Sequence, residues 1–390
     1  MDRTAREKLL EDVEAFCQEI RPSEELCYVE HRHNDQAIPL GKKYDLLGMP
    51  ILAEYGGRGC DVPTYARALA RIGQEGTGVR TLFSGHISIG QLPIQYWGSE
   101  TQKRKFLPAT ARGEKICAFG LTEPEAGSNP LELQMTYERR GNEFVLNGVK
   151  YLISNGTIAD LIVTFAYPRD GGRRMSAFIV ETNGDGIYRE ELTAKMGMPT
   201  ADTGMFELRD YAVPAENLLG DEGNGFRIAM HTLASGRLSV AAGSLGVIED
   251  CLAEAIRYAK QRSQHGKLIA RHQLVQEHIA EIEIARAASE AIVMMAAEAK
   301  GASDSQPHDP GLRSRADLLC AQAKYIATNA VWDAADRTVQ VFGGRGYSEL
   351  YRPARHLQDV RVGRIYEGTD EILKLKIAAA VLGKEFEAFK

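Results

Sequence analysis

Long apolar runs are missing from this chain of 390 residues, which contains no stretch of 18 or more apolar residues. A helix needs such a stretch to cross a bilayer, so the sequence predicts no membrane-spanning segment. The first 30 residues hold seven Glu and two Asp and no apolar core. They therefore lack the features of a secretory signal and of a mitochondrial presequence.

Cysteines are few, and the chain has no excess of positive charge. The six cysteines are scattered without any CxxC pair, which favours reduced thiols and a cytoplasmic location over a disulfide framework. Lys and Arg number 47 against 53 Asp and Glu, a net charge of -6. Binding to nucleic-acid phosphates requires a basic surface, so we expect no nucleic-acid partner.

Several nucleotide, metal and nucleophile motifs are absent. The chain has no GxxxxGK[ST] phosphate loop, no GxSxG elbow and no GxGxxG between a strand and a helix. The near match Gly343–Gly346 follows a helical stretch instead. His31 and His33 lie in a charged segment without a third well-placed ligand. We therefore expect a solvated turn there, and no metal.

The spacing of apolar residues divides the chain into three blocks. It is helical in residues 1–113, changes to short β-type runs in 114–222, and is helical again in 223–390. The length fits two or three domains of ordinary size. The pattern predicts an α+β protein in which an N-terminal helical domain, a middle β domain and a C-terminal helical domain pack as one body.

Local signals subdivide the last two blocks. Asn147-Gly148 and Asn155-Gly156 are expected as turns between the β-type runs. Ala-, Glu- and Leu-rich stretches predict helices at 246–300, 312–341 and 370–382. The polar segment Gly301–Pro310 predicts an exposed loop between two of them.

Two stretches carry residues suited to chemistry. Phe119–Asn129 combines hydroxyls, glycines and free backbone groups, which suits an extended polar ligand, although a plain loop between domains is the alternative. In Arg361–Glu371, Thr369 is expected to cap the last helix, which leaves Glu367 just outside the cap. A carboxylate there is either a surface charge or a general base that projects into a cavity.

These two stretches, together with Gln261–Leu268 and Phe342–Tyr347, resemble the acyl-CoA dehydrogenase family of flavoproteins, in order and over roughly residues 5 to 384. The resemblance implies a helical N-terminal domain, a β-barrel-like middle domain and a C-terminal four-helix bundle. It also implies a homotetramer with FAD bound across a subunit interface. The substrate would be acyl-CoA or an acyl carrier protein, and electron-transfer flavoprotein or another acceptor would take the electrons.

The resemblance also implies a mechanism. Glu367, in the run Tyr-Glu-Gly-Thr, matches the base that removes the α-proton of an acyl thioester while the β-hydrogen leaves as hydride to flavin N5. Some relatives carry this base on a helix of the C-terminal bundle. The corresponding stretch here, Leu233–Leu238, has no carboxylate, which strengthens the assignment of Glu367.

Other site residues are carried over by position. Cofactor contacts are implied for Leu121, Thr122, Ser128, Ser154, Arg262, Gln273, Gln340, Gly343, Gly344 and Thr369. Substrate contacts are implied for Arg80, Ser128, Arg237, Tyr366 and Gly368. Helix termination is the alternative for each glycine, and a surface ion pair is the alternative for Arg262. Leu152 stands where relatives usually have a tryptophan, and His265 stands where an aromatic side chain is usual.

Arg80 is the residue that bears on the identity of the acyl group. At helical spacing it shares a face with Phe83, Ser84 and Ile87. It also matches an arginine that pairs with the distal carboxylate of the substrate in the glutaryl-CoA dehydrogenase branch, which is the branch that this feature resembles most. An arginine that packs its stem and exposes its head is the alternative. Decarboxylating relatives have a glutamate at the position of Gly73, so desaturation without loss of CO₂ is favoured.

Three other functions stay open on the sequence alone. The first is an acyl-carrier-protein-linked dehydrogenase of polyketide extender-unit synthesis. The second is a flavin monooxygenase or desulfinase on the same scaffold, and the third is a binding protein without catalytic activity. The intact Glu367 argues against the last two.

Overall fold

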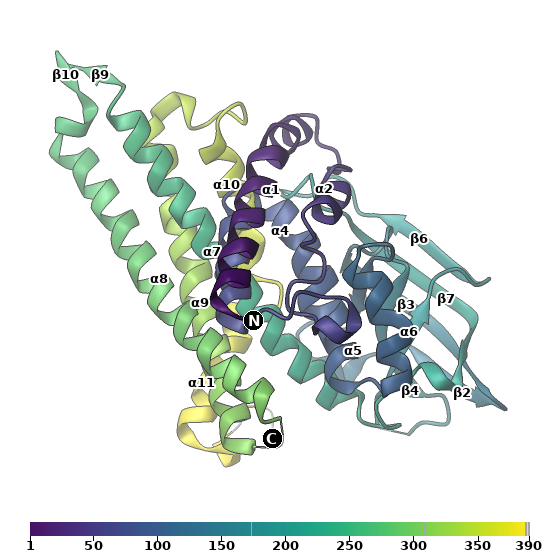
Figure 1. Ribbon diagram of the computed structural model, residues 1–390. Helices are drawn as coiled ribbons and strands as arrows, with labels where there is room; N and C mark the ends of the chain where they lie inside the picture. The colour runs from purple at the N-terminus through teal and green to yellow at the C-terminus, as the bar shows by residue number, and fades with distance from the viewer. Residues whose placement is uncertain (173, 308, 387, 389–390) are drawn as a thin grey trace.

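The computed structural model describes all residues except 173, 308, 387 and 389–390. Its N-terminal part is a layer of helices (Figure 1). They are α1 (Arg3–Val29), α2 (Ala37–Lys43), α3 (Val62–Gly73), α4 (Thr77–Phe83), α5 (Leu92–Trp97) and α6 (Glu100–Ala111). A π-helical segment, Ser84–Gln91, joins α4 to α5. Local caps explain two of the starts: Asp61 accepts from the backbone of Thr64, and Ser99 forms a capping box with Gln102.

Residues 117–219 form the β domain. Its strands are β1 (Cys117–Gly120), β2 (Thr136–Arg140), β3 (Glu143–Ser154), β4 (Leu161–Pro168), β5 (Ser176–Glu181), β6 (Ile187–Glu191), β7 (Thr203–Pro214) and β8 (Leu218–Leu219). They lie in the order β6-β7-β3-β2-β4-β5-β8, and β1 pairs parallel to β4. The largely apolar β-type runs at 144–146, 161–165 and 177–180 lie in β3, β4 and β5, where their apolar side chains fill the core of the domain.

One predicted turn in this domain is wrong. Asn147-Gly148 lies inside β3, where the register against β7 shifts between Leu146 and Gly148. Because β3 pairs with β7 on both sides of this point, the dipeptide stays in the strand, and the bulge is in β7, where Arg209 and Asp210 stand opposite Asn147. Asn155-Gly156 does form a turn, directly after β3 ends.

The C-terminal part is a bundle of helices, in which α7, α8 and α9 are long. They are α7 (Gly225–Ala259), α8 (Gln273–Ser305), α9 (Pro310–Phe342), α10 (Arg352–Val360) and α11 (Asp370–Leu382). The short strands β9 (Ser263–Gln264) and β10 (Lys267–Leu268) form a hairpin between α7 and α8. The continuous helix predicted for 246–300 is therefore wrong at 260–272, where His265 and Gly266 both take positive φ in the turn.

The predicted loop Gly301–Pro310 is also wrong over its first half, because α8 continues to Ser305. Lys300 and Asp304 pair one turn apart, and Tyr96 of α5 donates a hydrogen bond of 2.9 Å to Asp304. These contacts stabilise the last turn of the helix in a segment whose composition favours a loop. Residue 308 of the predicted loop lies outside the described residues.

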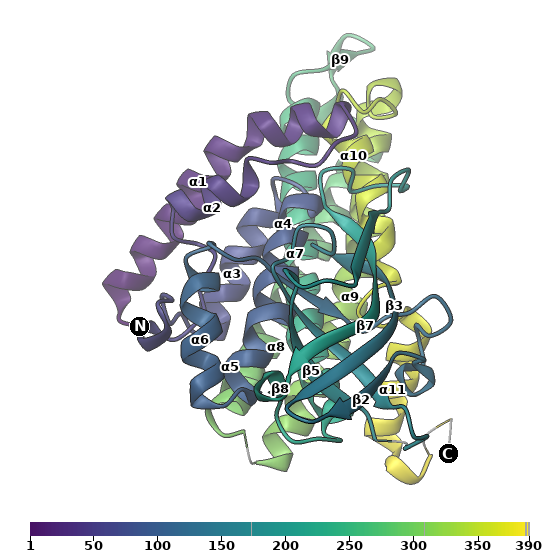
Figure 2. The same ribbon diagram turned by 90° about the vertical axis from the view of Figure 1, so that its right-hand side faces the viewer.

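The N-terminal helices lie between the sheet and the bundle, as Figures 1 and 2 show together. One apolar core joins them to α7, α8 and α9, and another joins them to the sheet and the start of α7. The α+β prediction with a C-terminal helical bundle is thus confirmed. No helix in the described ranges is long and apolar enough to cross a membrane. The cytoplasmic location stays a prediction.

Candidate active site

The segment before α11 presents Glu367 to the interior. Thr369 caps α11 by accepting a hydrogen bond of 3.3 Å from the backbone of Ile372, as predicted. Glu367 has φ +55° and Gly368 has φ +98°. Two consecutive residues in the left-handed region reverse the chain. The Glu367 side chain is thereby turned toward α7, against Gly236.

The carboxyl group of Glu367 lies against Gly236 of α7. A Cβ added at Gly236 would stand 2.4 Å from Glu367 Oε2, so only glycine leaves room for this carboxyl. Within the described residues, Oε2 is buried without a hydrogen-bond partner. Burial raises the pKa of Glu367 to about 7, although Arg237, Lys324 and Arg80 oppose that shift. A buried carboxyl that is partly ionised near neutral pH can act as a general base.

Two cations hold the backbone of this segment. Arg237 Nε of α7 donates to the Glu367 carbonyl at 3.1 Å, and Lys324 Nζ of α9 donates to the Gly368 carbonyl at 2.8 Å. Arg237 also pairs with Asp317 at 3.3 Å. Sequence reasoning predicted Arg237 and missed Lys324. The signal was present, because Lys324 interrupts the apolar face of a helix.

Arg80 is 2% exposed on α4. Its Nη2 donates to the Tyr366 hydroxyl at 2.6 Å. A Cβ added at Gly243 of α7 would lie 2.6 Å from Arg80 Nε, so this glycine gives the guanidinium its space. No carboxylate of the described chain lies within ion-pair distance of Arg80. The Arg80 guanidinium is buried, so the alternative of a guanidinium exposed to solvent is wrong. A buried positive charge requires an anionic partner.

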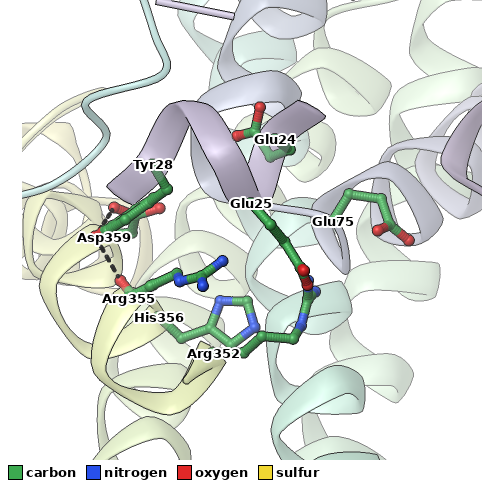
Figure 3. A pocket seen from close by; sticks show the side chains of 9 residues that line it. Glu24, Glu25, Tyr28, Glu75, Arg352, Arg355, His356 and Asp359 are labelled. Carbon is green, nitrogen blue, oxygen red and sulfur yellow. Dashed lines mark hydrogen bonds and ion pairs between the residues drawn. The ribbon is translucent and has the colours of Figure 1, made fainter. Parts of the chain in front are cut away.

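A cluster of charged residues lies behind α4. These residues line a cavity of about 10 Å³. Figure 3 shows the side chains that line it, among them Glu24, Tyr28 and Asp359. The Tyr28 hydroxyl donates to Asp359 at 3.0 Å, and a Cβ at Gly76 would stand 2.8 Å from Glu24 Oε1. A cavity of this size holds about one water molecule. It is too small for a substrate, and the cluster instead supports the start of the helix that carries Arg80.

Four predicted cofactor residues lie on the β domain. Leu121 is buried, Thr122 and Ser154 are half-buried, and Ser128 is exposed. The backbone N–H of Tyr151 donates to the Thr122 carbonyl at 2.9 Å, which joins the segment after β1 to the end of β3. A Cβ at Gly85 would lie 3.4 Å from Ser154 Cβ, so this surface reaches the π-helical segment that follows Arg80.

This surface suits an aromatic ring with polar edges. Leu152 has φ +60° and is 58% exposed, which leaves an apolar side chain uncovered close to the hydroxyl residues Thr122 and Ser154. Lys150, fully buried, pairs with Glu123 at 2.7 Å and donates to the Leu121 carbonyl at 3.1 Å. A fixed backbone, an apolar face and nearby hydroxyls together match what a flavin ring requires.

Of the other six predicted cofactor residues, Thr369 lies beside Glu367 at the start of α11 and five lie apart from this surface. Arg262, Gln273, Gln340, Gly343 and Gly344 are all exposed. They lie where α7 and α9 end and α8 begins, the end that carries the β9–β10 hairpin in Figure 1. Gln340 follows Lys324 by 16 residues of one helix, which is about 24 Å along its axis. The structure therefore does not bring this group together with Glu367 in one chain.

Comparison with known proteins covers almost the whole chain. The N-terminal, middle and C-terminal domains of acyl-CoA dehydrogenase match residues 4–114, 118–211 and 223–382. An acyl-CoA dehydrogenase of Bacillus subtilis is 38% identical over 367 residues, which are 94% of each chain.

Two solved structures are similar throughout. Butyryl-CoA dehydrogenase from Megasphaera elsdenii aligns with a TM-score of 0.91 and 33% identity, over 98% of this chain and 100% of that one. A glutaryl-coenzyme A dehydrogenase in complex with glutaryl-CoA aligns with a TM-score of 0.90 and 32% identity, over 98% of this chain and 96% of that one.

Proposed function

Because the chain belongs to the acyl-CoA dehydrogenase family of FAD-dependent oxidoreductases, we propose that it desaturates an acyl thioester between the α and β carbons with Glu367 as the base. The observation that supports this most is the buried, unpartnered Oε2 of Glu367 against Gly236. A carboxyl oxygen kept from solvent and from internal partners is available to a proton of the substrate.

The step conserves atoms and electrons. Glu367 takes the α-proton, and the electrons of the α C–H bond form the new double bond. The β-hydrogen leaves as hydride with the electrons of its own C–H bond. Bound FAD supplies the acceptor for that hydride. Arg237 and Lys324 favour the ionised form of Glu367 by their charge. The burial that raises its pKa to about 7 makes the carboxylate a stronger base than one in water.

The cofactor residues divide between two subunits in this proposal. Leu121, Thr122, Ser128 and Ser154 would hold the flavin and its nearer phosphate in one subunit, with Thr369 beside the base. Arg262, Gln273, Gln340, Gly343 and Gly344 lie too far from the same site and would meet the cofactor of a neighbouring subunit. A homotetramer would provide that neighbour, and electron-transfer flavoprotein is the acceptor we propose.

The acyl group carries a distal carboxylate in this proposal. Arg80 is buried with a hydroxyl as its hydrogen-bond partner, and an acidic end of the substrate would supply the missing counter-charge. Tyr366, Gly368 and Arg237 would line the same side. A Cβ at Gly73 would lie 2.6 Å from the Gly243 carbonyl. The glutamate that decarboxylating relatives have at this position therefore does not fit at position 73, so desaturation without loss of CO₂ is expected.

Anaerobic reduction of the bound flavin by a panel of mono- and dicarboxylic acyl-CoAs tests the proposal. Glu367→Gln should keep the fold and the FAD but lose thioester-dependent bleaching by at least about 10²-fold, since it lacks the base. Glu143→Gln, at the exposed residue that begins β3, is the control and should behave as wild type. Bleaching of Glu367→Gln at a wild-type rate would exclude Glu367 as the base.

The same preparation separates the other functions. A protein purified without a yellow chromophore near 1:1 would exclude every flavin-dependent reaction and favour a binding protein. A flavin that no acyl thioester bleaches, but that consumes O₂ in the presence of substrate once an external donor has reduced it, would favour a monooxygenase. Release of sulfite from a sulfinic-acid thioester without flavin reduction would favour a desulfinase. Reduction by acyl carrier protein thioesters but not by acyl-CoAs would identify the carrier.

A further inference from the structure

Lys324 is a buried cation on the interior face of α9. It shares that face with Cys320, Ala327 and Thr328, all of them buried and uncharged. Removing an ammonium from water is unfavourable unless polar groups compensate it. Its contacts therefore indicate its role.

The shortest contact of Lys324 is with backbone. Nζ lies 2.8 Å from the Gly368 carbonyl oxygen and 4.0 Å from Asp370 Oδ1. Asp370 has closer partners of its own, Arg364 at 2.9 Å and Asn329 at 3.1 Å. Lys324 is thus directed at the segment before α11 more than at a carboxylate.

That segment needs support from outside. Glu367 and Gly368 are consecutive residues with positive φ, and for Glu367 this conformation is unfavourable by itself. Arg237 of α7 donates to the Glu367 carbonyl, and Lys324 of α9 donates to the next one. Two cations from two helices therefore fix two adjacent peptide groups, and with them the direction of the Glu367 side chain.

We propose that Lys324 is a positioning residue for the base: by holding the Gly368 carbonyl it keeps the Glu367 carboxyl against Gly236, and by its charge it favours the ionised carboxylate. This inference rests on the proposed function, because it assigns Lys324 to proton abstraction.

The electrostatic surroundings are consistent with that role. The cations that act on Glu367 come from three elements: Arg80 from α4, Arg237 from α7 and Lys324 from α9. Lys324 in turn faces Asp370 and Glu371 of α11 as well as Glu367 and Arg237. Burial lowers the pKa of Lys324 to about 8, so it is still mainly charged at neutral pH, where the base must work.

Three substitutions separate charge from packing. Lys324→Met removes the charge and the donor while filling much of the same space, and Lys324→Arg restores both. In Lys324→Met we expect kcat for thioester-dependent flavin reduction to fall about 10- to 100-fold. The acid limb of its pH profile, which is the rise of kcat with pH as Glu367 ionises, should move to higher pH by about one unit, because loss of a cation makes Glu367 harder to ionise. Lys324→Gln replaces the Met variant if the latter does not fold, and should move the limb in the same direction.

Lys374→Met is the matched control. Lys374 is an exposed lysine of α11 that lies over the Tyr325 ring and not on the Glu367 segment. It should keep wild-type kcat and pH profile. Lys324→Arg should return the acid limb to the wild-type position and recover most of kcat, and all variants should keep a full complement of FAD.

A second readout does not depend on turnover. The infrared band of the Glu367 carboxyl, identified by its absence in Glu367→Gln, should titrate at higher pH in Lys324→Met than in wild type. Unchanged titration and kcat in Lys324→Met, or equal losses in Lys324→Arg, would overturn the positioning role. Absence of flavin reduction in wild type would instead refute the proposed function, while the infrared titration would still report on Lys324.

Discussion

Replacing Arg80 by glutamine tests whether the buried guanidinium binds the acidic end of a substrate. Arg80 is 2% exposed, and its hydrogen bond is to the neutral Tyr366 hydroxyl. If a substrate carboxylate is its partner, Arg80→Gln loses a desolvated ion pair, which is worth about 2–5 kcal/mol. That corresponds to a fall in kcat/KM of roughly 30-fold to several thousand-fold for dicarboxylic acyl-CoAs.

A ratio of substrates is needed because Arg80 has a second effect. Its charge lowers the pKa of Glu367, so Arg80→Gln moves the acid limb upward for every substrate. The ratio of kcat/KM for glutaryl-CoA to that for butyryl-CoA cancels this common effect. We expect that ratio to fall by the factor above, with butyryl-CoA spared or improved.

Arg71→Gln is the matched control. Arg71 is a half-buried arginine of the N-terminal helices, and it is paired with Glu14 at 2.5 Å and Glu75 at 2.6 Å. Its substitution should lower stability and leave the ratio unchanged. A wild-type ratio in Arg80→Gln would refute the acidic-substrate hypothesis and leave a dehydrogenase of neutral short acyl groups.

Other predictions follow from the same contacts. In wild type, kcat/KM should rise with pH through about 7, since burial raises the pKa of Glu367 to about 7 and the base must be ionised; a flat profile between pH 5.5 and 8.5 would contradict this. Gly236→Ala should lower kcat by at least about tenfold with FAD retained, because its Cβ would stand 2.4 Å from Glu367 Oε2; stopped-flow flavin reduction measures it. Arg262→Ala should weaken FAD retention and loosen the oligomer together, as seen by absorbance and sedimentation; full flavin in an unchanged oligomer would argue against a contact across subunits. Lys150→Met should lower the free energy of unfolding by about 3–5 kcal/mol in chemical denaturation, because it leaves Glu123 buried without its partner; a change below 1 kcal/mol would mean that the pair is dispensable.

Local signals in the sequence were enough for part of the site. The Thr369 cap depends on residues within one turn of each other, so it could be predicted and is confirmed. The placement of Glu367 outside that cap followed from the same signal. The burial of Arg80 could only be offered as one of two alternatives, because it depends on Gly243, far along the chain.

Features that depend on packing between distant elements were missed. The apolar face around Lys324 signals a buried lysine, but nothing in the sequence indicates that its partner is the Gly368 carbonyl 44 residues later. Asn147-Gly148 stays inside β3 because that strand pairs with β7 on both sides of it, and the end of α8 is helical because Tyr96 donates a hydrogen bond to Asp304. In each case a tertiary contact outweighs the local preference.

The contact between Gly236 and Glu367 has an evolutionary consequence. The two positions share one volume, since even a methyl group at 236 would overlap the carboxyl of 367. An acidic side chain can therefore occupy that volume from the helix or from the segment before α11, but not from both. A lineage that moved the base from one position to the other would have to change both residues, and each single change would give either a crowded enzyme or one without a base. Positions 236 and 367 should thus vary together among descendants of a common ancestor.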